Sequence, residues 1–340
     1  MRADRRYPQQ SDLRCVVLLS GWLCMASAVA ADATAAVHPL ARPPESLLLD
    51  IALVGERMVA VGEYGRIVFS DDDGMNWSEA PSPTRQMLTT VFFTSARQGW
   101  AAGHDGLILQ TRDGGDSWQL QRDGLAGQDP RQPAPAPLLD IWFRDPLEGW
   151  AVGAFGTLLH TRDGGQRWLD RSPLIDNAEG YHYYGIVGDA SGRILVVGEA
   201  GGLYRSLDGG EHWQTLDSPY AGSWFGVVHA TGSSRVAAFG LQGHVVYSSD
   251  FGASWHSARS GQQGSLAGGT VGRDDAIVLV GSMGTVLRSG ALAAGFDAIA
   301  TPQRRNLSAV CRNARGELWA VGQDGVTRLV PPDAAPGPTP

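Results

Sequence analysis

Short apolar runs separated by glycine-rich or polar turns recur along almost the whole chain. In one unit, apolar runs at 138–143, 149–152 and 157–160 are followed by a polar turn that ends at Trp168. Runs of four to six apolar residues bounded by turn residues predict β-strands. Each unit is therefore predicted to hold four strands, A to D, with strand D beginning at the tryptophan.

A Gly-x-x-Gly turn between strands B and C allows the units to be counted. Its first glycines lie 41 to 50 residues apart, at Gly62, Gly103, Gly153, Gly198, Gly240, Gly281 and Gly322. A period of about 40–45 residues with four short strands is typical of a propeller blade. The sequence predicts an all-β, seven-bladed β-propeller with four-stranded blades over residues 31–330.

The C–D turn of five units has the pattern Ser/Thr-x-Asp-x-Gly-x-x-Trp, called an Asp box. Its hydroxyl and carboxylate are expected to accept backbone N–H groups, and its tryptophan to pack between neighbouring sheets. A sixth copy keeps Ser289 and Phe296 but has Ala291 and Ala293 in place of Asp and Gly. The predicted structural residues are Ser70, Asp72, Gly74, Trp77, Thr111, Asp113, Gly115, Trp118, Thr161, Asp163, Gly165, Trp168, Ser206, Asp208, Gly210, Trp213, Ser248, Asp250, Gly252 and Trp255.

The two ends of the chain differ from the repeats. The last unit runs into Pro331 and Pro332, which cannot continue a ladder strand, so its strand D is missing. Residues 36–40 are expected to pair with 326–330, supply that strand and close the ring. Residues 331–340 are expected to be a disordered, Pro-rich tail.

Residues 1–30 have the pattern of a signal peptide. Four arginines precede the apolar run 15–30, which ends in small residues at Ala28 and Ala30. This run is short for a membrane span, which needs about 20 residues. Export with cleavage near Ala30 is predicted, by either the general or the twin-arginine route.

Charge and composition narrow the function classes. The net charge of −8 argues against non-specific nucleic-acid binding, and Cys311 is the only cysteine beyond the signal. Cys311 is expected to be a buried strand residue. The run Asp71–Asp72–Asp73 lacks the other ligands of a calcium loop, and the histidines lack metal-ligand spacing, so no metal or cofactor is expected.

The run Gly149-Trp150-Ala151-Val152-Gly153, followed by Thr161-Arg162-Asp163-Gly164-Gly165 and Trp168, resembles the photosystem II stability/assembly factor family of Asp-box propellers. The resemblance covers residues 36–330. It implies a non-enzymatic, monomeric protein that binds a protein partner of a membrane complex, either a photosystem or a transporter. It also implies the periplasm, or the thylakoid lumen in a photosynthetic host.

Asp boxes also occur in sialidases and xyloglucanases, so a glycosidase is the alternative. Asp50 and Asp140 fall at the same place in strand A, which lines the central channel of a propeller. Paired carboxylates can perform glycoside hydrolysis. The more common role of an aspartate at such a place is to cap a turn or bind water.

The B–C turns and D–A loops of a propeller share one face, and their residues vary while the scaffold repeats. The turns present Ala154–Phe155 and Met283 among others, and aromatic side chains and arginine are enriched in binding hot spots. The residues predicted to contact a partner on this face are Glu63, Tyr64, Arg85, His104, Asp105, Tyr183, Tyr184, Glu199, Tyr220, Trp224, Arg304, Arg305, Gln323 and Asp324.

Overall fold

Antiparallel sheets account for most of the described chain. The computed structural model describes residues 37–125, 134–272, 274–290, 295–301 and 304–329. The fold below is that of the compact unit 36–340. The predicted signal peptide and Pro-rich tail both lie outside the described residues. No helix within the described ranges is long and apolar enough to cross a membrane.

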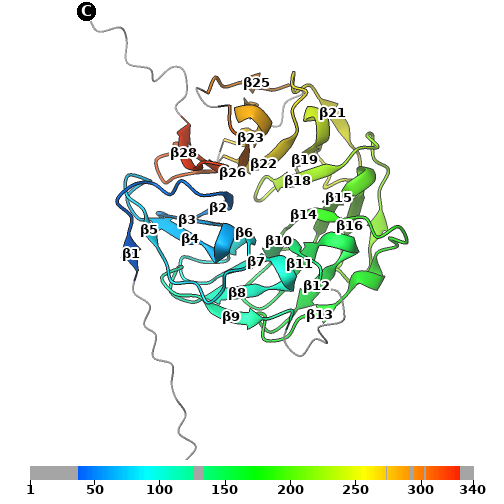
Figure 1. The fold of residues 1–340 in the computed structure, drawn as a ribbon. Helices are drawn as coiled ribbons and strands as arrows, with labels where there is room; N and C mark the ends of the chain where they lie inside the picture. Colours follow the sequence, from blue (N-terminus) through cyan, green and yellow to red (C-terminus); the bar gives the residue numbers. More distant parts are fainter. Residues whose placement is uncertain (1–36, 126–133, 273, 291–294, 302–303, 330–340) are drawn as a thin grey trace, which may run out of the picture. The chain divides into compact units, whose positions relative to one another are not determined.

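Seven sheets follow one another along the chain, each forming one blade (Figure 1). Blade 1 contains β2 (Leu48–Val54), β3 (Arg57–Gly62), β4 (Ile67–Ser70) and β5 (Ser78–Glu79). Blade 2 contains β6 (Leu88–Phe93), β7 (Gly99–Gly103), β8 (Ile108–Thr111) and β9 (Gln119–Arg122). Blade 3 contains β10 (Leu138–Phe143), β11 (Gly149–Gly153), β12 (Leu158–Thr161) and β13 (Leu169–Asp170).

The second half of the ring repeats this plan. Blade 4 contains β14 (Tyr183–Gly188), β15 (Ile194–Gly198), β16 (Leu203–Ser206) and β17 (Gln214–Thr215). Blade 5 contains β18 (Trp224–His229), β19 (Val236–Gly240), β20 (Val245–Ser248) and β21 (His256–Ala258). Blade 6 contains β22 (Leu266–Val271), β23 (Ile277–Gly281), β24 (Val286–Arg288) and β25 (Asp297–Ala298). Blade 7 contains β26 (Leu307–Arg312), β27 (Leu318–Gly322) and β28 (Gly325–Leu329).

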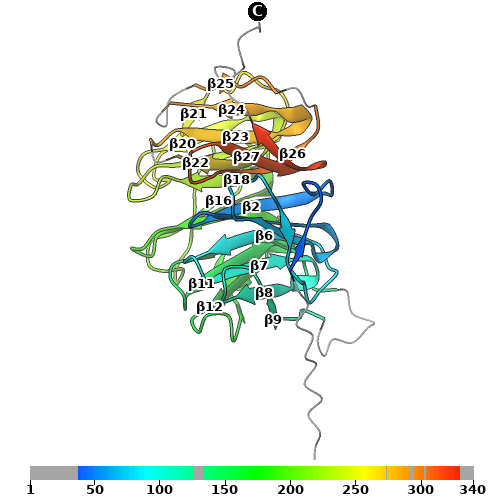
Figure 2. The same cartoon turned by 90° about the vertical axis from the view of Figure 1, so that its left-hand side faces the viewer.

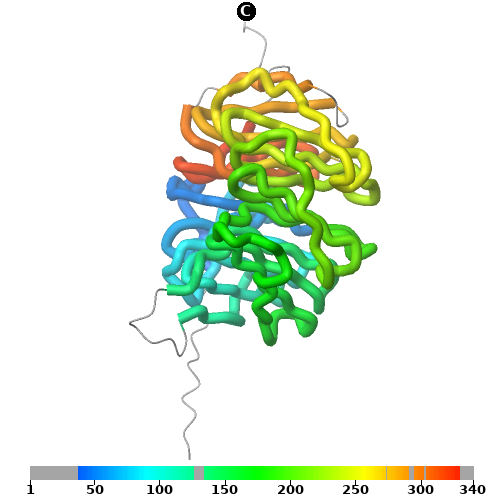
Figure 3. Tube along the Cα trace, turned by 90° about the vertical axis from the view of Figure 1, so that its right-hand side faces the viewer, coloured from blue at the N-terminus to red at the C-terminus, as the bar shows by residue number. Residues whose placement is uncertain are grey.

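The innermost strands of successive blades contact one another, and β2 of the first blade contacts β26 of the last. The side view shows β2 between β6 and the strands of blade 7 (Figure 2). The tube view shows the same neighbourhood of the two ends of the fold, with the blue first blade beside the red last one (Figure 3). The prediction of an all-β, seven-bladed propeller is confirmed.

The prediction of how the ring closes is wrong. Strand β1 (His38–Pro39) pairs with β5, not with β28, so blade 1 has five strands and blade 7 has three among the described residues. The chain then reaches the last blade only at Pro44, whose carbonyl accepts the N–H of Val326 at 3.3 Å. Proline has no N–H to donate, so the Pro43–Pro44 pair cannot form a ladder on β28.

Apolar contacts between neighbouring blades hold the ring together. Trp118 of blade 2 packs with Val59 and Phe69 of blade 1 in one buried cluster. The first and last blades meet in the same way, because Trp77 packs edge-on against Trp319 with ring centroids 6.4 Å apart. The closure therefore rests on side-chain burial rather than on a shared strand.

Candidate partner-binding face and central channel

One backbone hydrogen bond repeats in all seven blades and determines which loops share a face. The first residue after strand B donates its N–H to the residue just before strand A, as in Ala154 N–H to the Pro137 carbonyl at 2.9 Å. The equivalent donors are Glu63, His104, Glu199, Leu241, Ser282 and Gln323. The B–C turns and the D–A loops therefore lie together at one end of the blades, called here the B–C face.

Six B–C turns hold a non-glycine residue in the left-handed region. Their middle residues have φ between 53° and 57°, and they are Tyr64, Asp105, Phe155, Ala200, Gln242 and Met283. A side chain in this conformation costs about 1–2 kcal/mol relative to an ordinary backbone. Three of these residues are nevertheless large, apolar and exposed: Tyr64 by 78%, Phe155 by 70% and Met283 by 68%. The turns thus direct these side chains into solvent.

A row of rings connects one of these turns to the centre of the propeller. Phe155 lies edge-on to His182 at 4.9 Å, and its N–H contacts His182 Nδ1 at 3.2 Å. His182 contacts Tyr184 at 6.0 Å, and Tyr184 contacts Phe225 at 5.3 Å. Tyr184 and Phe225 both line the central channel. The row therefore runs from the exposed turn of blade 3 to the channel at blades 4 and 5.

A second ring cluster lies on blade 5. Tyr220 stacks on His244 at 3.7 Å and meets Trp224 edge-on at 5.4 Å. The Tyr220 hydroxyl donates to the Gln242 side chain at 3.4 Å. Tyr220 is thus ordered by contacts from the same blade.

Most residues predicted to contact a partner are accessible on the B–C face. The exposed ones are Tyr64, Arg85, His104, Arg304, Arg305, Gln323 and Asp324. The partly exposed ones are Glu63, Asp105, Tyr184, Glu199 and Tyr220. Arg305 and Asp324 form a surface ion pair at 3.2 Å.

Tyr183 and Trp224 are placed differently from the prediction. Both have no exposed side-chain surface, so the expectation that they contact a partner is wrong. Each is the first residue of strand A, the position at which Leu48, Leu88 and Leu138 also enter the core. The sequence pattern assigns both residues to D–A loops, whereas strand A begins at each of them.

Two predicted contact residues also have a structural role. Glu63 accepts the N–H of Leu47 at 3.1 Å, and Glu199 accepts the N–H of His182 at 3.2 Å. Each carboxylate therefore holds the D–A loop against its own B–C turn. The sequence placed Phe155 and Met283 in B–C turns on this face without predicting them as contact residues, and the structure shows that both are largely exposed there.

The two candidate catalytic carboxylates lie in the central channel, beside a cavity of about 200 Å³. Asp50 Oδ2 accepts the N–H of Val91, and Asp140 Oδ2 accepts the N–H of Ile186, both at 2.8 Å. Thr90 Oγ1 lies 3.2 Å from Asp50 and 3.1 Å from Asp140. Burial raises the pKa of Asp50, and burial together with the charge of Asp50 raises the pKa of Asp140 to about 7.

The Asp boxes lie at the other end of the blades. Box N–H groups donate to A–B turns, as in Gly114 N–H to the Arg97 carbonyl at 2.9 Å. Within the first box, Ser70 Oγ accepts the N–H of Gly74 at 2.9 Å, and Asp72 accepts the N–H of Asn76 at 2.8 Å. The same two bonds form in the boxes that begin at Thr111, Thr161, Ser206 and Ser248. The degenerate sixth box lies partly outside the described residues.

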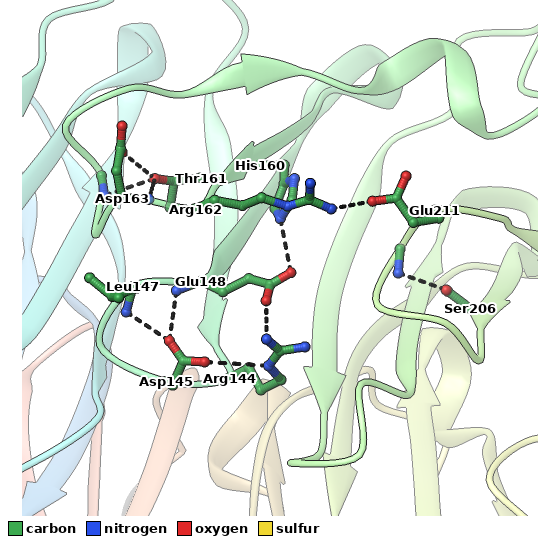
Figure 4. A network of polar contacts seen from close by, with 12 residues as sticks. Arg144, Asp145, Leu147, Glu148, His160, Thr161, Arg162, Asp163, Ser206 and Glu211 are labelled. Carbon is green, nitrogen blue, oxygen red and sulfur yellow. Dashed lines mark hydrogen bonds and ion pairs between the residues drawn. The ribbon is translucent and has the colours of Figure 1, made fainter.

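A charged network joins blades 3 and 4 on this box side (Figure 4). Glu148 contacts Arg144 and lies 3.3 Å from Nε2 of the buried His160. His160 stacks on Trp150 at 3.9 Å, and Arg162 pairs with Glu211 of the next blade. Burial lowers the pKa of His160, against the opposing effect of Glu148.

The described ranges hold no cluster of side chains suited to a metal ion. No group of three or more His, Cys, Asp or Glu side chains that could hold an ion lies there. The Asp72 and Asp113 carboxylates are instead occupied by their own turns.

Known proteins resemble both the sequence and the fold. The family model described as Photosynthesis system II assembly factor YCF48 matches residues 131–334. The photosystem II stability/assembly factor HCF136 of the Cyanidioschyzon merolae chloroplast is 40% identical over 48 residues, which is 14% of this chain and 11% of that protein.

Among solved structures, YCF48 bound to a D1 peptide has a TM-score of 0.65 at 16% identity, over 86% of this chain and 94% of that one. YCF48 from Cyanidioschyzon merolae has a TM-score of 0.65 at 16% identity, over 88% and 100%. The WD40 propeller domain of Doa1 has a TM-score of 0.66 at 13% identity, over 85% and 94%. At these identities the likenesses show the propeller fold. Because the family model covers more than half of the sequence, the chain belongs to the family described as Photosynthesis system II assembly factor YCF48.

Proposed function

We propose that this chain is a non-enzymatic, exported propeller that binds a protein subunit of a membrane complex on its B–C face. The observation that carries the proposal is Phe155, an exposed aromatic side chain on a left-handed backbone, from which a row of rings leads to the channel. Six B–C turns share this backbone, so the feature that distinguishes Phe155 is its large exposed ring, a side-chain type enriched in binding hot spots.

The family and the exposed side chains of the face support a protein partner. YCF48 has been solved with a D1 peptide, which supports a peptide segment of a photosystem subunit as the ligand of this chain. A transporter subunit in the periplasm is the corresponding partner in a host without photosystems. The protein is proposed to act as a monomer, in the periplasm or in the thylakoid lumen.

The environment of Asp50 and Asp140 supports a binding protein over a glycosidase. Each carboxylate accepts a main-chain N–H from the neighbouring blade and a second one from the next residue in its own strand. A carboxylate engaged in this way stabilises the fold and is poorly placed to attack a sugar or to transfer its proton to one.

Partner binding by variants on the B–C face and away from it tests the proposal. The tagged protein is co-purified with its membrane complex from the native host, and its affinity for a labelled D1 peptide is measured by fluorescence anisotropy. Phe155→Ala is expected to weaken both interactions at least tenfold, because truncation of an aromatic hot spot typically costs 2 kcal/mol or more. Reversal of the charge at Arg304 and Arg305 is expected to weaken co-purification as well.

Met75→Ala is the matched control. Met75 is 69% exposed, almost as much as Phe155, but it lies in an Asp box at the other end of the blades. Binding should be unchanged in this variant. Equal losses in Phe155→Ala and Met75→Ala, or a partner that neither variant affects, would place the binding surface elsewhere. Turnover of an aryl glycoside that disappears in the Asp50→Asn, Asp140→Asn double variant would establish the glycosidase instead.

A further inference from the structure

Three side-chain oxygens form a chain across the inner strands of the propeller. Asp50 on β2, Thr90 on β6 and Asp140 on β10 follow one another with contacts of 3.2 and 3.1 Å. Asp140 also reaches the N–H of Ile186 on β14. These side-chain contacts therefore connect the inner strands of blades 1 to 4.

The row of side-chain contacts Asp50–Thr90–Asp140 lacks one proton when both carboxyls are ionised, because each contact needs a hydrogen to be a hydrogen bond. A threonine hydroxyl carries one proton and can donate to one oxygen at a time. If both aspartates are ionised, Thr90 donates its proton to one of them. Its oxygen then faces a negatively charged oxygen of the other with no hydrogen between them, which is repulsive. One additional proton turns both contacts into hydrogen bonds, from Asp140 to Thr90 and from Thr90 to Asp50. Two carboxyls that share one site commonly retain one proton in this way.

The described lining of the cavity supplies no positive charge to replace that proton. None of the described residues that line the cavity is basic. The titratable groups on the inner strands β14, β18 and β26 are Tyr183, Tyr184, His229, Cys311 and Arg312. Of these, Tyr184 lines the cavity and Cys311 interacts with the charge of Asp50. Burial, and then the charge of Asp50, raise the pKa of the Cys311 thiol to about 12, and burial raises the pKa of Tyr184. Both groups therefore remain neutral at physiological pH.

We propose that the Asp50–Thr90–Asp140 chain holds one shared proton and acts as a pH-sensitive clamp on the inner strands of blades 1 to 4. The proton comes from water and returns to water when the clamp opens. Blades 5, 6 and 7 have Gly226, Gly268 and Ala309 at the matching position, so the device is confined to one part of the ring.

The sign of the pH dependence follows from the pKa of Asp140, which is higher in the folded protein than its usual value near 4. The stabilisation is fully present below about pH 4 and is lost as the pH rises through about 7. In this window a single bound proton changes the unfolding equilibrium by up to about tenfold per pH unit.

Infrared spectroscopy of the purified wild-type protein tests the shared proton directly. At pH 6, where ordinary carboxyls are ionised, the C=O band of a protonated carboxyl is expected, and it should disappear by pH 9. The band should be absent in Asp140→Asn and retained in Asp217→Asn, which changes an exposed aspartate. Absence of the band in the wild-type protein at pH 6 would overturn the proposal, whether or not the variants fold.

Urea unfolding at pH 6 and pH 8.5 tests the clamp itself. The wild-type midpoint is expected to fall relative to that of Asp140→Asn, whose amide can donate to Thr90 at either pH. Thr90→Val removes the bridging hydroxyl and should reduce the same difference. An identical pH response of the wild type and Asp140→Asn would show that the proton, even if present, does not clamp the strands.

Discussion

The tryptophans of the Asp boxes differ in depth, although the box sequence around them repeats. Trp118 is only 5% exposed, packs with Val59 of the preceding blade and donates its Nε1–H to the Gly115 carbonyl at 3.1 Å. Trp168 is half-buried, and its Nε1 has no hydrogen-bond partner. The sequence predicted both residues and their contact with a neighbouring blade, because the box is a local pattern. The sequence could not predict which of the two is more deeply buried, since burial depends on the side chains of the next blade.

The two tryptophans should therefore differ when truncated. Trp118→Ala is expected to lower the free energy of unfolding by about 3–5 kcal/mol, the usual cost of removing a buried aromatic side chain. Trp168→Ala should lower it by less, because part of that ring remains in water. Urea denaturation at pH 7 measures both changes. Equal losses would contradict the assigned difference in depth.

His160 is a second pH-sensitive residue, and its effect on stability has the opposite pH dependence to that of the channel carboxyls. Its pKa is depressed by burial below the usual value near 6.5, so folding favours the neutral ring. Stability is expected to decrease as the pH falls below about 6.5, because the unfolded chain takes up a proton more readily. His160→Gln should flatten this part of the urea-midpoint curve between pH 7 and pH 5. The control is His104→Gln, which replaces an exposed histidine on the B–C face and should leave the curve as it is in the wild type.

At the scale of the element, the B–C turn is the unit that builds the proposed binding face. The Gly-x-x-Gly spacing predicted all seven turns. It did not reveal that the third residue adopts a left-handed conformation, because that position is occupied by residues as different as Tyr64, Ala200 and Met283. Nothing in their residue types marks them as alike. Only the backbone geometry shows that the exposed aromatic residues occupy strained positions.

Ala200 allows the strain in these turns to be measured without removing a large side chain. Its φ is 53°, a conformation that glycine adopts freely. Ala200→Gly is expected to raise the free energy of unfolding by about 1 kcal/mol. Gly201→Ala, one residue later, should lower it, because an added Cβ would lie 2.5 Å from the Tyr220 carbonyl oxygen. Thermal or urea unfolding measures the stability of both variants. A loss of stability in Ala200→Gly would contradict the assigned backbone strain.

At the scale of the whole molecule, the repeat predicted the number of blades but not how the ring closes. Seven copies of one pattern reinforce one another, so errors in single strands did not affect the architecture. Closure depends instead on one segment that has no second copy in the chain. Its proline pair, at 43 and 44, was the available signal against pairing with β28. The burial of Trp77 against Trp319 could not be predicted, because it joins residues from opposite ends of the fold.

An engineered disulfide can distinguish the observed closure from the expected one. Pro39 and Ser78 are directly paired between β1 and β5, and paired Cα atoms in an antiparallel ladder lie about 4.5–5.5 Å apart. This separation suits a disulfide. The Pro39→Cys, Ser78→Cys variant is therefore expected to form the bond on mild oxidation, as shown by mass spectrometry of a non-reduced digest.

Pro39→Cys combined with Arg328→Cys is the matched control, since it would crosslink only if the N-terminal segment lay along β28. Cys15 and Cys24 are replaced by serine in both variants, while the buried Cys311 can remain, because its thiol stays protonated and unreactive. A disulfide between positions 39 and 328 would instead support ring closure by pairing of the N-terminal segment with β28. A bond between positions 39 and 78 alone, with the propeller still unfolding in one transition, would mean that apolar contacts between the first and last blades are sufficient to keep the ring closed.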